Sequence, residues 1–458
     1  MARGRCKLAF GLCFWLWSEM SEFLQRVWRP MHGPRVDLLV RGEALAVVLF
    51  AWKAYASSGE GKMWAVGSFW LHALCAVSVG VLLFGARPAL LVASSLLACA
   101  CMVANHWSPD SLLWFPAAEW PLFVILPLAT WWCGREGDAI TAFRLGGATA
   151  MGFAGFHKLN SDFFDPVVTC NRLAYRLTEW WGIPEGVYAW VTPTVVVSME
   201  LSLPLLLWFR PRLGVLAGCL LLAQFVGIGA SALSMVVGVC VLSFLNADDH
   251  AALRAWSWRF GVAAIPGALL SYGLYLGPWS WPQYGFCHGI LGAVAMFLVL
   301  RMERLGWGDA ATLFRGRSYR VAVLALFWWF NGMAPYTGLK FQYSFAMLSN
   351  LRVDAVRHNS LVVPKALRFS AHDPYVHVRH AEYRRSGKRL RDGFVQPGLY
   401  TPFELEKQAR IASEVGEELV VLGTYRGEPV DLARARALPS AHLFQKRLAL
   451  EGPQPCVH

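Results

Sequence analysis

Ten polar or ionisable residues lie within or at the ends of long apolar stretches, and these residues are the ones that could do chemistry. They are Lys53, His72, Asn105, His106, Glu119, Lys158, Glu200, Gln224, His288 and Asn331. An ionisable group at the centre of a bilayer costs ~2.5–3.5 kcal/mol on insertion scales, so each such residue needs a physical reason.

Lys158 has the clearest chemical use. Burial disfavours the charged form of a lysine, which can then act as a neutral general base near pH 7. A nearby histidine would orient the amine or stabilise an oxyanion. Apolar walls with access from lipid would suit a lipophilic molecule that has an acidic hydroxyl, such as a quinol.

Each candidate also has a simpler interpretation. A lysine at the end of a span usually extends its amine to the interface, and this alternative stays open for Lys158. A histidine such as His72 or His288 is more often an interhelical hydrogen-bond partner. Arg41 and Glu43 are interpreted as topology and cap residues at the start of a span. The His377-x-x-His380 pair lies on a predicted strand, where residues three apart face opposite sides, so we expect no metal site there.

The composition indicates which elements must position these residues. The 458-residue chain is 56 % hydrophobic and 16 % charged, and it contains 22 Trp; ordinary soluble domains carry about 25 % charged residues. These values exclude a soluble enzyme, a disordered chain and a disulfide scaffold. The net charge of +12 fits membrane topology and contact with anionic lipid better than nucleic-acid binding.

The hydropathy pattern predicts an all-α polytopic membrane bundle of about nine to eleven spans, since ~20 apolar residues are needed for each. Residues 1–37 are expected to form an amphipathic cytoplasmic segment. The shorter stretch 232–246 would complete a hairpin. The predicted spans are 38–57, 64–84, 88–106, 111–132, 139–158, 187–208, 213–231, 261–277, 283–301 and 319–337.

Positive charge predicts the orientation. If the N-terminus is cytoplasmic, the inner connections carry clustered arginines, whereas the outer turns 231–234 and 277–283 carry no Lys or Arg. The inner arginines are Arg87, Arg135, Arg144, Arg210, Arg212, Arg254, Arg259, Arg301, Arg304, Arg315, Arg317 and Arg320. This topology places Lys158 and His106 on the outer side, Glu200 and Gln224 deeper, and the C-terminal part outside. We expect a multi-pass plasma (inner) membrane protein.

Three domains are expected: the segment 1–37, the transmembrane domain 38–337 and a small extramembrane α+β domain 338–458. In the last, Val376–Arg379 and Glu418–Gly423 alternate like strands, and Thr401-Pro402 opens a helix that runs to about Val415. Residues 159–186 are expected to form an outer segment with an interfacial or re-entrant helix.

Three ordered motifs in residues 38–350 resemble one family. The stretch Ala154-Gly155-Phe156-His157-Lys158-Leu159-Asn160 is similar to the A-G-x-x-K-L segment of the vitamin K-dependent gamma-glutamyl carboxylases. Asp162-Phe163-Phe164-Asp165-Pro166 looks like their bacterial relatives, which carry a horizontally transferred transmembrane (HTTM) domain. Ala104-Asn105-His106 resembles the family's N-N-H, and Pro335–Lys340 with Tyr343–Met347 its passage into the extramembrane domain.

The resemblance implies a mechanism. The lysine that matches Lys158 would deprotonate vitamin K hydroquinone or another membrane quinol, with His106 and Asn105 assisting. Reaction with O2 would give a strong base that removes a γ-proton from glutamate, and CO2 would add to the carbanion. We add His157, Glu119 and His288 as candidate quinone contacts, and expect no metal. Expected partners are membrane lipid, a lipophilic quinol and a peptide or protein substrate, without nucleic acid.

The sequence also departs from the family. Ala104 replaces the first Asn of N-N-H, Gln224 is the nearest polar residue to a histidine usual in a later span, and the extramembrane part has only about 120 residues. Quinol epoxidation is thus better supported than protein carboxylation, a carbon–carbon lyase reaction. Two alternatives stay open: a non-catalytic HTTM-scaffold protein that binds lipid or peptide, and a transporter, for which 213–246 is the only feature.

Overall fold

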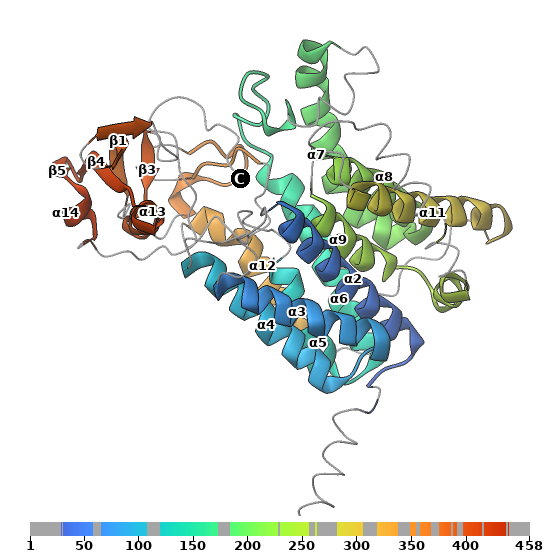
Figure 1. The fold of residues 1–458 in the computed structure, drawn as a ribbon. Coiled ribbons are helices and arrows are strands. Elements are labelled where there is room, and N and C mark those ends of the chain that lie inside the picture. The colour runs from blue at the N-terminus through green and yellow to red at the C-terminus, as the bar shows by residue number, and fades with distance from the viewer. Residues whose placement is uncertain are drawn as a thin grey trace, which may run out of the picture.

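The computed structural model describes residues 29, 31–57, 66–107, 120–172, 184–227, 230–255, 262, 282–305, 318–337, 349–353, 358–367, 375–385, 388–391, 397–414, 416–436 and 438. Within these residues the chain is mostly helical, with a small antiparallel sheet near the C-terminus. Figure 1 shows the helices gathered together and the sheet to one side of them. The predicted secondary structure, helices followed by a small α+β unit, is confirmed.

Each predicted apolar stretch that the structure describes contains a helix. Proline begins four of these helices, where its missing N–H removes no hydrogen bond. The predicted stretch 261–277 lies outside the described residues except for residue 262, as does the first part of 111–132. The helices are α2 (Pro34–Ser57), α3 (Val66–Phe84), α4 (Pro88–Trp107), α5 (Trp120–Cys133), α6 (Glu136–His157), α7 (Glu185–Phe209), α8 (Pro211–Gly227), α9 (Ser231–Leu242), α11 (Pro282–Leu305) and α12 (Tyr319–Thr337).

The helices share one continuous apolar core. Helix α2 packs against α3 and α9, while α6 packs against α7, α9 and α12. Helices α8 and α9 pack together as the hairpin predicted for 213–246, and α11 lies on α8. Helix α6 is thus central in the bundle, and its C-terminal end carries the A-G-x-x-K-L motif.

Long-range hydrogen bonds show which helix ends lie together. Met31, just before α2, donates to the carbonyl of Ala86 after α3, and His32 bonds the carbonyl of Thr130 near the end of α5. Arg35 in the first turn of α2 donates to the carbonyl of Leu245 after α9. The start of α2 and the ends of α3, α5 and α9 therefore form one end of the bundle, here named the basic end. The charge pattern predicts this end to be cytoplasmic.

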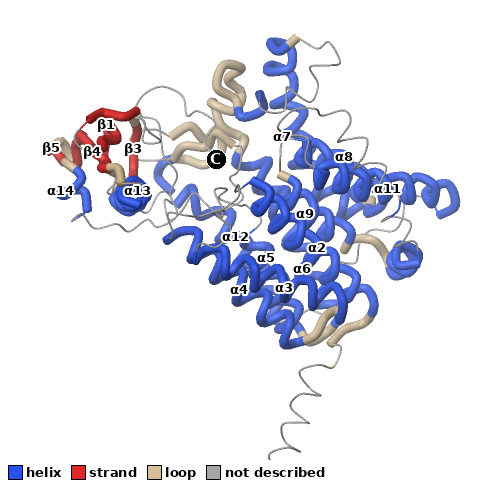
Figure 2. The backbone as a smooth tube through the Cα atoms, viewed as in Figure 1, coloured by secondary structure: helices blue, strands red, loops and turns tan. Residues whose placement is uncertain are grey.

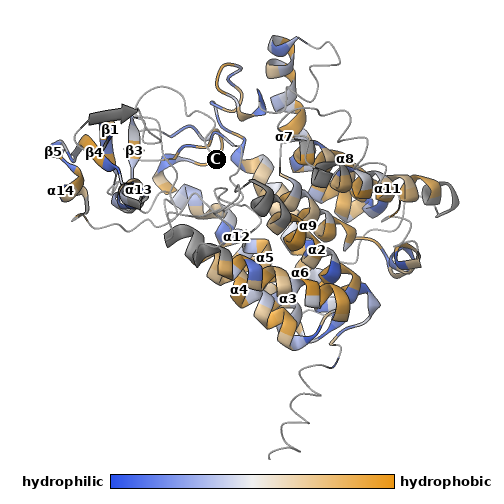
Figure 3. Cartoon of the chain, viewed as in Figure 1, coloured by the Kyte–Doolittle hydropathy of each residue, from blue (hydrophilic) through white to orange (hydrophobic). Residues whose placement is uncertain are grey.

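Apolar side chains also cover the outside of the helices. In Figure 3, hydrophobic residues colour the helices along much of their length. Exposed large apolar residues include Phe69, Leu83, Leu96, Trp131 and Phe330. Among the described residues, α7 is the one helix both long and apolar enough to cross a membrane. Shorter apolar stretches are Phe69–Phe84, Pro88–Val103, Pro121–Cys133, Pro211–Val226, Ser231–Leu242 and Phe286–Leu300.

The sequence had suggested that Arg41 and Glu43 flank the start of a span, but the structure places them elsewhere. Helix α2 begins at Pro34, so both residues lie inside it. Arg41 forms an ion pair with Asp37, one turn earlier, at 2.9 Å. Glu43 is buried. The interpretation as cap residues was wrong because the helix starts a turn or more before the apolar run.

The C-terminal unit confirms the predicted strands and helix. Its strands are β1 (Val376–Arg385), β2 (Lys388–Arg391), β3 (Gly398–Tyr400), β4 (Glu418–Tyr425) and β5 (Glu428–Val430), and its helices are α13 (Pro402–Glu414) and α14 (Leu432–Arg436). The order is β2-β1-β4-β5, with β3 also paired to β1, and every pair is antiparallel. Buried residues of β1 and β4 meet α13 in a separate small core.

Candidate functional site around Lys158

Lys158 is the C-cap residue of α6, directly after His157. Its backbone N–H donates to the carbonyl of Gly155 at 3.1 Å, and its backbone is still helical, with φ −81° and ψ −10°. The side chain turns back along the helix, so that Nζ also donates to the carbonyl of Ala154 at 3.2 Å. The residue is 4 % exposed. The lysine is thus held inside the protein by the last turn of its own helix.

The Lys158 amine faces Glu200 on α7. Nζ lies 2.8 Å from both carboxylate oxygens, and the two side chains are 6 % and 0 % exposed. Two charges removed from water to this extent lose hydration, which their mutual attraction offsets only when the geometry is good. The alternative in which Lys158 extends its amine to the interface is therefore wrong.

Gly155 makes this pairing possible. A β-carbon at Gly155 would lie 3.0 Å from Cβ of Glu200 and from Cγ of Leu201. Small residues allow helix backbones to approach closely, and Lys158 follows on the next turn of α6. Glu200 lies 15 residues into α7, beside Gly155 and therefore about one turn before the Lys158 end of α6. Its depth in a membrane relative to Lys158 stays a prediction.

Aromatic and apolar side chains enclose the pair. The Lys158 amine lies 5.9 Å from the centre of the Phe163 ring, within the range of a cation–π contact. Phe163 belongs to a small core with Cys170 and Val197, against which Leu159 and Leu201 pack. The segment Asp162–Pro166 therefore supplies an apolar wall beside the ion pair.

His157 faces another helix. It is fully buried, and its Nδ1 lies 3.1 Å from the hydroxyl of Tyr336 on α12. Its ring also packs against Phe153, Phe156 and Tyr336. Consecutive residues of the motif thus point to opposite neighbours, Lys158 to α7 and His157 to α12.

Buried amides fix the loop that follows Lys158. The Asn160 side chain donates to the carbonyls of His157 and Ser349 and accepts from the N–H of Phe163. The Asn359 side chain donates to Asp162 at 3.0 Å.

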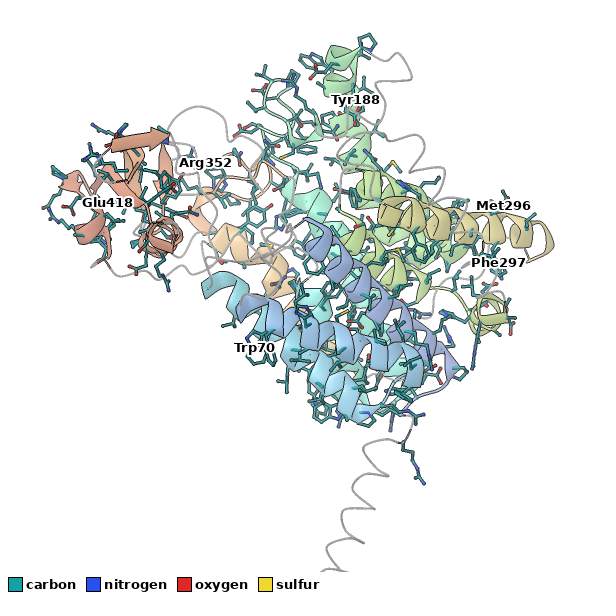
Figure 4. All side chains as sticks on the ribbon, in the orientation of Figure 1. Trp70, Tyr188, Met296, Phe297, Arg352 and Glu418 are labelled. Carbon is teal, nitrogen blue, oxygen red and sulfur yellow. The ribbon has the colours of Figure 1, made fainter. Side chains whose placement is uncertain are left out.

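The chain after α12 holds this loop in place through further long-range bonds. Asn350 accepts from the N–H of Cys170 at 2.7 Å and donates to the carbonyl of Val168. In Figure 2 the loop and this segment are the tan tubes near the upper end of the helices, and Figure 4 labels Arg352 within the segment.

The other predicted site residues are not brought to Lys158 by any described contact. Asn105 and His106 lie in the last turn of α4, but their side chains are outside the description, as is all of Glu119. His288 on α11 places Nε2 2.9 Å from the carbonyl of Ala223 on α8. That contact is the interhelical hydrogen bond given above as the simpler interpretation.

Sequence reasoning missed the partners of the site. Glu200 had been noted only as an unexplained polar residue, and Tyr336, Asn350 and Asn359 had no assigned role. A usable signal was present in the motif A-G-x-x-K: a glycine one turn before a buried lysine predicts a close helix crossing, and Glu200 was an acidic candidate for the facing helix.

The site contains groups that can exchange a proton. An ammonium and a carboxylate in contact at 2.8 Å can pass a proton between them and leave a neutral amine beside a neutral acid. Among the described residues, no group of three or more His, Cys, Asp or Glu side chains could hold a metal ion. Cys170, in the loop after Lys158, is disulfide-bonded.

Comparisons with protein-family models, with curated proteins and with solved structures found no match to this chain.

Proposed function

We propose that the chain is a polytopic membrane protein in which Lys158 and Glu200 form a proton-accepting site for a lipophilic acidic hydroxyl. The observation that carries this proposal is the buried Lys158–Glu200 pair with its aromatic wall. Ionisable residues within an apolar bundle are costly, so a buried pair of them is a functional-site hypothesis.

Membrane insertion is supported by two features. Exposed apolar side chains on the helices would face lipid, which satisfies apolar surface as water does not. The arginines concentrate at alternate connections, as the positive-inside rule requires. We infer a plasma (inner) membrane location with a cytoplasmic N-terminus and the C-terminal unit outside. The disulfide at Cys170 fits an outer, oxidising side.

The proposed chemistry begins with the proton shared by the pair. Transfer from the Lys158 ammonium to the Glu200 carboxylate gives a neutral amine and a neutral acid. The amine then takes the hydroxyl proton of a bound quinol, leaving an ammonium and a quinolate. Glu200 thus holds one proton while Lys158 accepts another, and no net charge appears in the apolar site beyond the ammonium–quinolate pair.

The resemblance of the motif around Lys158 favours reduced vitamin K or a similar membrane quinol as substrate, with O2 as oxidant. The bound quinolate with O2 would supply the strong base that the carboxylase family uses, with CO2 as the further substrate when a glutamate is carboxylated. Epoxidation is the half of this carboxylase-like activity that the Lys158 site itself addresses, because no described surface is assigned to a peptide or protein substrate.

The test is quinone epoxide formation by membranes that contain the protein, supplied with reduced vitamin K and O2. We expect Lys158→Ala to reduce the rate by roughly 10²–10⁴, the usual contribution of a general base. Glu200→Gln should also reduce it, and Arg172→Ala, which changes an exposed residue of the same loop, should not. Correct folding of each variant in detergent is checked by size-exclusion chromatography. Wild-type membranes that form no epoxide would refute the proposal.

A second candidate function is a non-catalytic HTTM-scaffold protein that binds lipid or peptide. The bidentate geometry of the ion pair and the buried amides that hold the neighbouring loop favour it, because both would serve equally as structural ties. It predicts no turnover of the quinol and normal folding of Lys158→Arg, whereas a proton-accepting role predicts loss of activity in that variant.

A further inference from the structure

Two arginines meet at the basic end of the bundle. Arg35 donates from Nη2 to the carbonyl of Leu245, and Arg144 on α6 donates from Nε to the carbonyl of Ser243, each at 2.9 Å. The two acceptors are two residues apart, just after α9. The guanidinium groups therefore lie near each other although they come from different helices, and like charges repel.

Arg144 is buried without a carboxylate among the described residues. It is 8 % exposed, and its guanidinium carbon lies 5.7 Å from the centre of the Phe244 ring. Its hydrogen bond within the described chain is the one from Nε to the carbonyl of Ser243. The neighbouring charge that acts on the Arg144 guanidinium is that of Arg35, which is also positive. The negative charge of Glu136 acts on Arg35 and partly offsets the positive charge of that residue.

A buried histidine completes the group. His250 is 2 % exposed, and both ring nitrogens lack a partner in ordinary hydrogen-bond geometry among the described residues, with the backbone of Leu242 beside the ring. Burial first, and then the charge of Arg35 with a smaller effect of Arg144, lowers the pKa of His250 to about 4. His250 is thus close enough to both arginines for their positive charges to disfavour its protonation.

A neighbouring pair shows how this protein neutralises a buried arginine in the ordinary way. Arg212, at the start of α8, donates from Nε and Nη2 to the two oxygens of Asp249 at 3.0 and 3.3 Å. These side chains are 5 % and 1 % exposed. A buried charge without such a partner is strongly destabilising, so the contrast between Arg212 and Arg144 calls for an anion at Arg144.

We propose that Arg35, Arg144 and His250 form a binding site for a phosphate-bearing anion at the basic end of the bundle. The planar guanidinium fork matches the oxygens of a phosphate bidentately. Arg35 is only partly buried, so the site is open at its edge. The phosphate belongs either to the headgroup of an anionic phospholipid or to a free phosphate. The site is independent of the chemistry proposed at Lys158.

The test measures binding to the full-length purified protein in neutral detergent. One arm adds phosphatidylglycerol, with phosphatidylcholine as the neutral lipid, and the other adds inorganic phosphate. Native mass spectrometry counts bound lipid, and tryptophan fluorescence follows the thermal midpoint as either compound is titrated. We expect Arg144→Gln to weaken binding about tenfold, the usual effect of one lost charged hydrogen bond. Stabilisation by lipid alone assigns a headgroup, and stabilisation by inorganic phosphate assigns a free anion.

Arg210→Gln is the matched control, because Arg210 is an exposed arginine at the turn between α7 and α8 and its loss changes the net charge equally. If Arg144→Gln does not fold, Arg35→Gln at the open edge tests the same site and should weaken binding severalfold. The proposal is overturned if neither compound binds the wild type, or if Arg210→Gln weakens binding as much as the cluster variants do.

Discussion

Glu200→Gln is the sharpest test of the ion pair at the proposed site. The substitution keeps the shape of the side chain and removes its charge, so the Lys158 ammonium loses its carboxylate while staying buried. Lys158 donates to both oxygens of Glu200 at 2.8 Å, and the acceptor side chain is fully inaccessible. Water cannot enter to replace the lost partner without disturbing the contact between α6 and α7.

The expected magnitude follows from this geometry. Hydrogen bonds to charged groups contribute about 1.5–3 kcal/mol each, and removal of one partner from a buried pair costs about 3–5 kcal/mol. We therefore expect Glu200→Gln to lower the free energy of unfolding by about 3–5 kcal/mol. Lys158→Met should have an effect of similar size, and the double variant should lose less than the sum by about 2–3 kcal/mol, since it leaves no unpaired charge.

The assay is reversible unfolding in mixed detergent micelles, followed by tryptophan fluorescence. The chain supplies a matched control in the ion pair of Arg172 and Glu185, whose side chains are 43 % and 45 % exposed. Exposed pairs contribute about 0–1 kcal/mol, so Glu185→Gln should have little effect. If Glu200→Gln shifts stability no more than Glu185→Gln, or if the two single effects add without coupling, the pair is not the desolvated contact argued above.

Three further predictions concern packing, the amide network and pH. Asn359→Ala should destabilise the protein by about 2–3 kcal/mol and speed proteolysis between α6 and α7, because the side chain holds that loop. Gly332→Ala should cost about 1–3 kcal/mol in thermal unfolding, since its β-carbon would clash with the Phe153 ring, whereas Gly292→Ala meets nothing within 4 Å and should be neutral. The pKa of His250 falls from 6.5 to about 4 on folding, so the folded state binds fewer protons in that window. Acidification from pH 6.5 to 4 should therefore remove up to about 3 kcal/mol of the stability that depends on a neutral His250, and His250→Gln should remove this part of the pH dependence.

The helices and the small C-terminal unit could be predicted because their signals are local. Apolar runs, proline at helix starts and strand alternation in Val376–Arg379 depend on neighbouring residues alone. The predicted helix boundaries were wrong where polar residues form the first turn of a helix. Helix α2 begins at Pro34, although the apolar run begins at residue 38. Arg41 and Glu43 therefore lie in the interior of the helix and not at its start.

The site could be predicted only in part because its contacts are long-range. Lys158 was identified from its own motif, but Glu200 is 42 positions away and Asn359 is 197 positions from Asp162. A sequence pattern reports which residues are polar within an apolar stretch, whereas the crossing of α6 and α7 decides which of them meet. The same limit applies to Arg144, which the charge pattern assigned to topology and the structure places beside Arg35.

The buried cations of the bundle differ in whether a buried carboxylate lies beside them. Lys158 and Arg212 each have one buried carboxylate at hydrogen-bond distance, so each pair is close to neutral as it stands. Arg144 lies 14 residues before Lys158 on the same helix, which is about 21 Å at 1.5 Å per residue, and it has no described carboxylate. A bound anion at Arg144 would supply the neutralising charge that Glu200 and Asp249 supply to the other two cations. The two proposals therefore concern opposite halves of α6, and a variant at either site should leave ligand binding or turnover at the other site unchanged.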